Sequence, residues 1–147
     1  MPGELGYDTG PFVNAAVFCE TVIDGKDDVL SLVRIIDRMT INAQGAEAPD
    51  DLPPGAVKAN LVVMLRAGKA LGGQKLRIDL ETPDGNQMRS PEQTIHFTAG
   101  EAGGANVIAP MTIPVSSAGL FWANVYINDR LMSRVPLEIR YSVTRSP

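Results

Sequence analysis

Apolar and polar side chains alternate through much of this chain with a period of two residues. In "QKLRIDLE", residues 74–81, Leu76, Ile78 and Leu80 fall on one face and charged side chains fall on the other. A β-strand has this period because its successive side chains point to opposite faces. The next residues, "TPDGN", predict a turn, since proline fixes φ and glycine accepts positive φ. The alternation therefore predicts strands joined by tight turns.

Other segments fit the same pattern. "TIHFT" alternates again, and "ANLVVMLRAG" is apolar at most positions, as expected of a central strand that ends near Gly68. In "NVIAPMTIPV", Pro110 and Pro114 share one parity while Ile113 and Val115 share the other. A proline cannot donate a hydrogen bond within a sheet, so this segment is predicted to be an edge strand.

Residues 29–39 allow two interpretations. Val29, Leu32, Val33 and Ile36 have helical spacing. The β-branched residues of the segment instead favour a strand, paired in a hairpin across Asp24-Gly25. We favour the strand and keep the helix as the alternative.

About eight strands with short connections predict an all-β fold, an antiparallel two-sheet β-sandwich of the Ig-like or C2-like kind. The connections are too short for the crossover helices of a parallel sheet. The irregular segments at residues 43–56 and 99–105 are too short to separate domains, so residues 1–147 are expected to form one domain.

Composition excludes several classes of protein. A hydrophobic fraction of 44% with no run of about 18 apolar residues argues against a membrane span. The net charge is −4, which argues against nucleic acid as a partner. The single cysteine, and an N-terminus without a basic and then apolar pattern, suggest a cytoplasmic protein.

The residues of common catalytic sites are sparse. His96 is the only histidine and lies on the polar side of its strand, while Cys19 lies within an apolar strand as a small hydrophobic residue. "RAGKALGGQK" lacks the spacing of a phosphate-binding loop. We therefore expect no enzyme, no catalytic residues and no cofactor.

Carboxylates provide the one metal hypothesis. Asp24, Asp27 and Asp28 share one turn, and some sandwich domains bind calcium at loop ends. Asp50, Asp51 and Asp84 lie in other loops. Aspartate is also common in ordinary turns, and no DxDxDG spacing is present, so no metal ligands are assigned.

The segment "GLFWANVYINDRLMSRVPLEIRY", residues 119–141, predicts a hairpin whose register decides where Trp122 points. A two-residue loop at Asn128-Asp129 places Trp122 beside Val135 in the core, and a three-residue loop turns it outward. We favour Trp122 inside. Either a loop of the same chain or a partner could cover the outer face. That outer face supplies the candidate interface, which comprises Phe121, Val125, Met132, Arg134 and Pro136.

The segments "AVFCETV", "LSLVRIIDRMTI", "LRIDLETPDG" and "FWANVYINDRLMSRVPLEIRY" together resemble a bacterial family of small domains of unknown function, over Ala15 to Tyr141. The resemblance implies a bacterial or phage-associated β-sandwich, and it brings no catalytic or ligand residues.

The function expected is a non-enzymatic module that binds a protein or self-associates through the hairpin face. The alternative is a small-ligand or carbohydrate-binding sandwich that uses its loop ends and an exposed Trp122, with calcium as an option.

Overall fold

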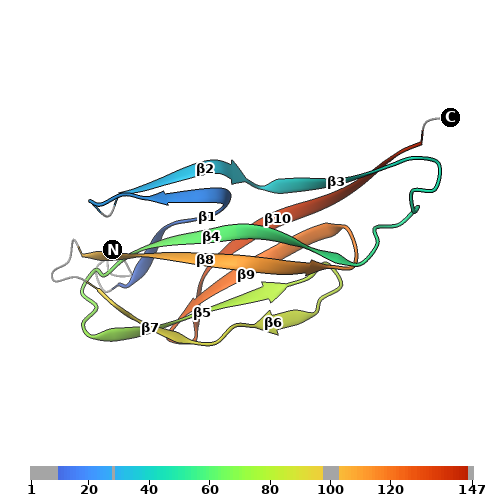
Figure 1. Ribbon diagram of the computed structural model, residues 1–147. Helices are drawn as coiled ribbons and strands as arrows, with labels where there is room; N and C mark the ends of the chain where they lie inside the picture. The colour runs from blue at the N-terminus through green and yellow to red at the C-terminus, as the bar shows by residue number, and fades with distance from the viewer. Residues whose placement is uncertain (1–9, 28, 98–102, 146–147) are drawn as a thin grey trace, which may run out of the picture.

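The computed structural model describes residues 10–27, 29–97 and 103–145, and within them it has strands and turns but no helix (Figure 1). No helix in this part of the chain is therefore long and apolar enough to cross a membrane. The predicted all-β fold is confirmed.

The strands form two packed sheets. The first sheet has the order β2-β1-β4-β8, and the second has the order β3-β10-β9-β5-β6, with β7 also paired to β5. The first contains β1 (Phe12–Asp24), β2 (Leu30–Ile36), β4 (Gly55–Arg66) and β8 (Gly104–Val115). The second contains β3 (Arg38–Gln44), β5 (Gly73–Glu81), β6 (Gln87–Arg89), β7 (Gln93–His96), β9 (Gly119–Ile127) and β10 (Arg130–Thr144). The described residues thus form ten strands rather than about eight.

Residues 30–44 explain part of the difference. They run as β2 and β3 with a break at Asp37, so the helical alternative for residues 29–39 is wrong. β2 pairs with β1 in antiparallel fashion, as expected, but β3 pairs with β10 in parallel. The Glu138 N–H donates to the Asp37 carbonyl oxygen over 2.9 Å at the crossing. This extended segment passes from one sheet to the other and joins them along one side (Figure 1).

The core lies between the sheets and follows the predicted alternation. Leu76, Ile78 and Leu80 of β5 are at most 7% exposed, and they pack with the inward side chains of β4, β9 and β10. β4 lies between β1 and β8, as a central strand should. β8 is an edge strand with Pro110 and Pro114 exposed, which confirms that prediction.

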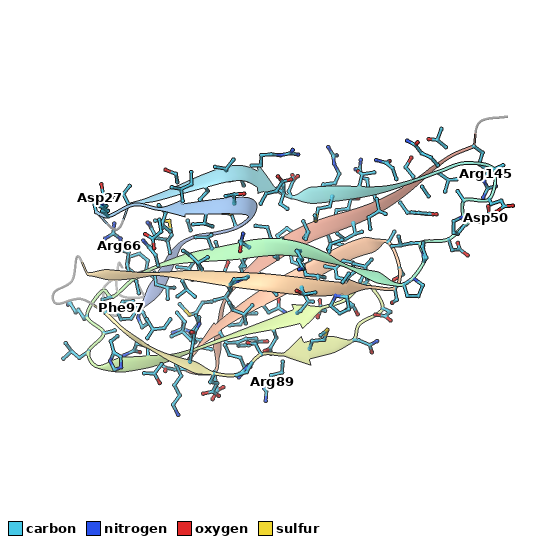
Figure 2. The ribbon with its side chains drawn as sticks, in the orientation of Figure 1. Asp27, Asp50, Arg66, Arg89, Phe97 and Arg145 are labelled. Atoms are coloured by element: carbon cyan, nitrogen blue, oxygen red, sulfur yellow. The ribbon has the colours of Figure 1, made fainter. Side chains whose placement is uncertain are left out.

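The long loop covers residues 45–54 and is held against the end of β10. The Tyr141 hydroxyl donates to the Pro49 carbonyl oxygen over 2.7 Å. Arg145 pairs with the Asp50 carboxylate at the same end of the sandwich (Figure 2). The second predicted loop, residues 99–105, falls mainly outside the described residues.

Candidate interaction face

The β9–β10 hairpin has the two-residue turn that the sequence predicted. Ile127 pairs with Arg130, and Asn128 and Asp129 have φ values of 50° and 63°. Two successive residues with positive φ make a type I′ turn, whose twist matches that of the flanking strands. Asparagine and aspartate tolerate this conformation better than most residues do.

The predicted register fails beyond the turn because β10 contains a bulge. Tyr126 pairs with Leu131, but Val125 pairs with Ser133, so Met132 is an extra residue on β10. A bulge shifts all later pairs by one position. Val135 therefore lies opposite Ala123, and Trp122 lies opposite Pro136. The prediction that Trp122 points into the core is wrong.

This shift places the residues of the candidate interface on two different faces of the hairpin. Phe121 and Val125 are 1% and 0% exposed and belong to the core, so they cannot form a contact surface. Met132 is half-buried at the bulge and packs against the core. Arg134 and Pro136 are exposed on the outer face.

Asn124 was the sequence signal for the correct orientation. It lies between Trp122 and Tyr126 on the even-numbered face of β9, whereas Phe121, Ala123 and Val125 on the other face are all apolar. Burying a carboxamide among apolar side chains is costly unless it finds a partner. On the outer face its Oδ1 accepts a hydrogen bond of 2.9 Å from Arg134 Nε.

Arg134 connects three strands of the outer face. Its guanidinium lies 4.3 Å from the centre of the Trp122 ring, a cation–π contact. Its Nη2 pairs with Glu81 Oε2 on β5 over 2.8 Å. One side chain thus fixes the position of the indole relative to both neighbouring strands.

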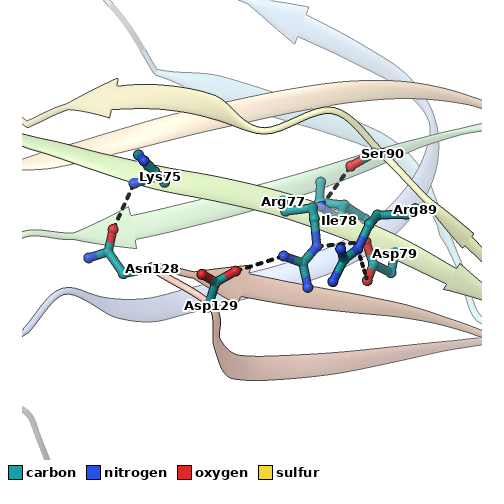
Figure 3. A network of polar contacts seen from close by, with 8 residues as sticks. All are labelled: Lys75, Arg77, Ile78, Asp79, Arg89, Ser90, Asn128 and Asp129. Carbon is teal, nitrogen blue, oxygen red and sulfur yellow. Dashed lines mark hydrogen bonds and ion pairs between the residues drawn. The ribbon is translucent and has the colours of Figure 1, made fainter.

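Arg77 repeats the arrangement closer to the turn, in a more buried setting. Its guanidinium lies 4.4 Å from the centre of the Tyr126 ring. Its Nε donates to Asp79 over 3.0 Å and its Nη1 donates to Asp129 over 2.8 Å (Figure 3). The hydrogen bond to Asp79 raises the pKa of Arg77. The side chains of Arg77 and Asp79 are only 8% and 6% exposed, although they lie on the outer side of the sheet.

The turn itself is bound to β5. The Asn128 N–H donates to the Lys75 carbonyl oxygen over 2.8 Å, and the Lys75 N–H donates to Asn128 Oδ1 over 3.0 Å (Figure 3). Asn128 Nδ2 also donates to Gln74 Oε1 over 2.7 Å.

We call Arg77, Trp122, Tyr126, Arg134 and Pro136 the arginine–aromatic face. Its two rings are held in place from β5, β9 and β10.

The remaining sequence candidates lie apart from this face. His96 is exposed on β7, and Cys19 is fully buried on β1, where burial raises the pKa of its thiol. Asp84 accepts a hydrogen bond from the Thr82 hydroxyl in the β5–β6 turn, which lowers the pKa of its carboxyl. Asp28 falls outside the described residues. Among the residues that the structure describes, no three histidine, cysteine, aspartate or glutamate side chains are grouped to hold a metal ion.

Comparisons with solved structures give distant likenesses. An immunoglobulin-like protein from Pseudomonas aeruginosa is 14% identical, with 90% of this chain and 98% of that chain covered and a TM-score of 0.46. A Pseudomonas fluorescens alkylpurine DNA glycosylase bound to abasic-site DNA is 12% identical, with a TM-score of 0.41. That match covers 67% of this chain but only 27% of the glycosylase.

No curated protein sequence matches the chain. A family model described as a family of unknown function, DUF6941, matches residues 14–140. The match coincides closely with the segments that carried the sequence resemblance, and it spans most of the chain. The protein therefore belongs to this family of unknown function, DUF6941.

Proposed function

We propose that this protein is a non-enzymatic, cytoplasmic binding module that docks on another protein through its arginine–aromatic face. The observation that carries the proposal is the fixed arrangement of two guanidinium groups over two aromatic rings on the outer side of one sheet. The single cysteine, which is buried and unpaired, supports a reducing compartment.

The residue types favour a protein partner. Tryptophan, tyrosine and arginine are the side chains most enriched among the residues that dominate binding energy at interfaces. Pro136 lies opposite Trp122 and adds rigid apolar area beside the indole. The exposed side chain of Leu120, 43% accessible, extends this apolar area along β9. A compact group of this composition suits the centre of an interface.

The hydrogen bonds within the arginine–aromatic face also favour a role in binding. Arg134 is held by both Asn124 and Glu81, and Arg77 is held by both Asp79 and Asp129. Side chains that are fixed before binding lose less conformational entropy when a partner arrives. The face is therefore organised for binding in the free protein.

The charge of the outer side selects an acidic partner. Strand register and alternation place six basic and three acidic side chains on its strands, and the turn adds Asp129, which is bound to Arg77. The outer side thus has an excess of two positive charges in a chain whose net charge is −4. The basic side chains are Arg38, Lys75, Arg77, Arg89, Arg134 and Arg140, and the acidic ones are Asp79, Glu81 and Glu138. Complementary charge accelerates association and excludes partners of like charge. We expect the partner to present a carboxylate-rich surface.

The test uses affinity capture from the native host, followed by titration of each captured protein, purified, against the purified chain. Trp122→Ala and Arg134→Glu are expected to weaken binding by roughly 30-fold or more, the loss typical of a central interface residue. Leu71→Asp is the matched control, because Leu71 is 90% exposed and lies outside the face. Added salt should weaken binding of the unaltered chain.

Two results would oppose the proposal. One is a purified partner that binds Trp122→Ala and Arg134→Glu as tightly as it binds the unaltered chain. The other is light scattering that shows dimers or larger assemblies which the same two substitutions dissociate. In that case a second copy of the chain, rather than an acidic partner, occupies the face.

A further inference from the structure

The two long sides of the sandwich differ. On one side the continuous segment of β2 and β3 joins the sheets. On the other side β8 ends the first sheet, while β6 and β7 end the second. Figure 1 shows β8 running along this side above β7 and β6.

The second sheet is interrupted on this open side. β6 pairs with residues 79–81 of β5, and β7 pairs with residues 73–76, so residues 90–92 lie between two short edge strands. The hydroxyl of Ser90 accepts a hydrogen bond of 2.9 Å from the Ile78 N–H (Figure 3). A side-chain oxygen therefore occupies a place where a continuous edge strand would supply a carbonyl oxygen.

A cavity of about 500 Å³ lies at the interruption. Leu76, Ile78 and Leu80 of β5 line it, together with Met88 of β6 and Met111 of β8. A second cavity of about 310 Å³ shares Met88 with the first and is also lined by Pro114, Val115 and Ser116. We call the two together the edge groove. Its larger part has the volume typical of a small-molecule site.

The edge of β8 limits what can occupy this groove. Within a strand, the N–H and C=O groups of alternate residues point to the same side. Pro110 and Pro114 lie opposite Asn60 and Ala56 of β4 but cannot donate to that strand, so the backbone groups of their parity point to the free edge, where both positions lack a donor. A peptide strand added at β8 would therefore lack two of the donors along that edge. A hydrocarbon chain needs none.

The charges at the rim select an anionic head group. Arg89 lines the groove, its side chain is 72% exposed, and its Nε is 3.9 Å from Asp79, which is bound more closely by Arg77. Figure 2 shows Arg89 at this side of the molecule. Glu92, also on the rim, lies at the β7 end of the interruption, whereas Arg89 belongs to β6. An anionic head is therefore favoured at the β6 end.

We propose that the edge groove binds a free single-chain anionic amphiphile, with its alkyl chain over Leu76, Ile78 and Leu80 and its carboxylate at Arg89. The site differs from the arginine–aromatic face, because its apolar residues face the gap between the sheets and it shares no residue with that face. Binding at one site can therefore fail while binding at the other remains. Arg89, at the rim, is also one of the basic side chains of the outer side.

The test is calorimetric titration with octanoate, decanoate and dodecanoate below their micelle concentrations. The dissociation constant is expected to fall by roughly fourfold for each added methylene, the factor for burying one methylene group, until the groove is full. Alkyltrimethylammonium ions of the same chain lengths should bind more weakly, because Arg89 repels their heads.

Two substitutions test the binding of the alkyl chain and the binding of the head group separately. Met88→Asp places a carboxylate in the groove and should weaken decanoate binding by at least about tenfold. Arg89→Gln should weaken decanoate but leave neutral decanol unaffected. Leu71→Asp, an exposed apolar residue outside the groove, is the control and should change neither. Circular dichroism checks that each variant is folded, and Arg89→Gln alone tests the site should Met88→Asp fail to fold.

Absence of binding by all three alkanoates would overturn the proposal, as would affinity independent of chain length. So would decanoate binding that Arg89→Gln leaves unchanged. A dimer dissociated by Met88→Asp or Arg89→Gln, in a chain that binds no alkanoate, would assign the groove to a second copy.

Discussion

The two faces of strand β9 carry different parts of the protein's chemistry. On its odd-numbered face, Phe121, Ala123 and Val125 are at most 1% exposed and belong to the core. Its even-numbered face holds Trp122 and Tyr126, each beneath a guanidinium. Both faces are rich in large side chains, so size and apolarity do not distinguish them. The difference is that the outer rings have charged partners on neighbouring strands and the inner side chains do not.

The comparison shows how one inserted residue can define a surface. Because Met132 is bulged, the turn at Asn128-Asp129 leaves Phe121 and Val135 on the same inner face. Without the bulge, the same turn would place Trp122 beside Val135 and leave Phe121 outside. The account of the interaction face therefore depends on this bulge.

The largest effect should come from truncating the inner face. Phe121→Ala is expected to lower the free energy of unfolding by about 3–5 kcal/mol, because it removes a ring from a close-packed core. Trp122→Ala should lower it by only about 1 kcal/mol, because it removes a half-buried ring and one cation–π contact. Urea unfolding followed by circular dichroism measures both. Equal losses, or a larger loss for Trp122→Ala, would contradict the assignment of the two faces.

A smaller difference in the free energy of unfolding is expected between variants of Arg77 and Arg134, the two arginines of the arginine–aromatic face. Arg77→Leu should cost about 3 kcal/mol, because it leaves Asp79 buried with only the more distant Arg89 as a cation. Arg134→Leu should cost about 1 kcal/mol, since its ion pair with Glu81 is partly exposed and solvent-screened. The same unfolding assay measures these free energies.

The double variant Arg77→Leu with Asp79→Leu is the control for that contrast. Removing both charges should restore part of the stability lost in Arg77→Leu, because no unpaired carboxylate remains buried. Strictly additive losses would mean that the two side chains are not coupled, against the geometry described here.

Sequence alternation was sufficient to predict the sheets, because burial on one side of a strand leaves a period of two. It identified the buried residues of β5 and the edge position of β8, where Pro110 and Pro114 indicate a strand with a neighbour on one side only. It also identified the turn at Asn128-Asp129, where two residues that tolerate positive φ are adjacent.

The sequence did not reveal features that depend on one residue or on distant segments. The bulge at Met132 shifts the alternation of β10 by one residue, so that Leu131 lies opposite Tyr126 and Ser133 lies opposite Val125. Only Asn124 indicated this outcome. The parallel pairing of β3 with β10 joins residues about a hundred positions apart, and no local pattern reports it. The edge groove likewise arises where β8 meets an interruption at Ser90 in another sheet.

The most direct test is the set of nuclear Overhauser contacts made by the single tryptophan. The structure places the Trp122 indole against the side chains of Pro136 and Arg134, and Phe121 opposite Leu137 in the core. Contacts from the indole to Pro136 and Arg134, together with contacts from the Phe121 ring to Leu137, are the expected result. Contacts from the indole to the methyl groups of Val135, with Phe121 against Pro136, would contradict the bulged register and the interaction face derived from it.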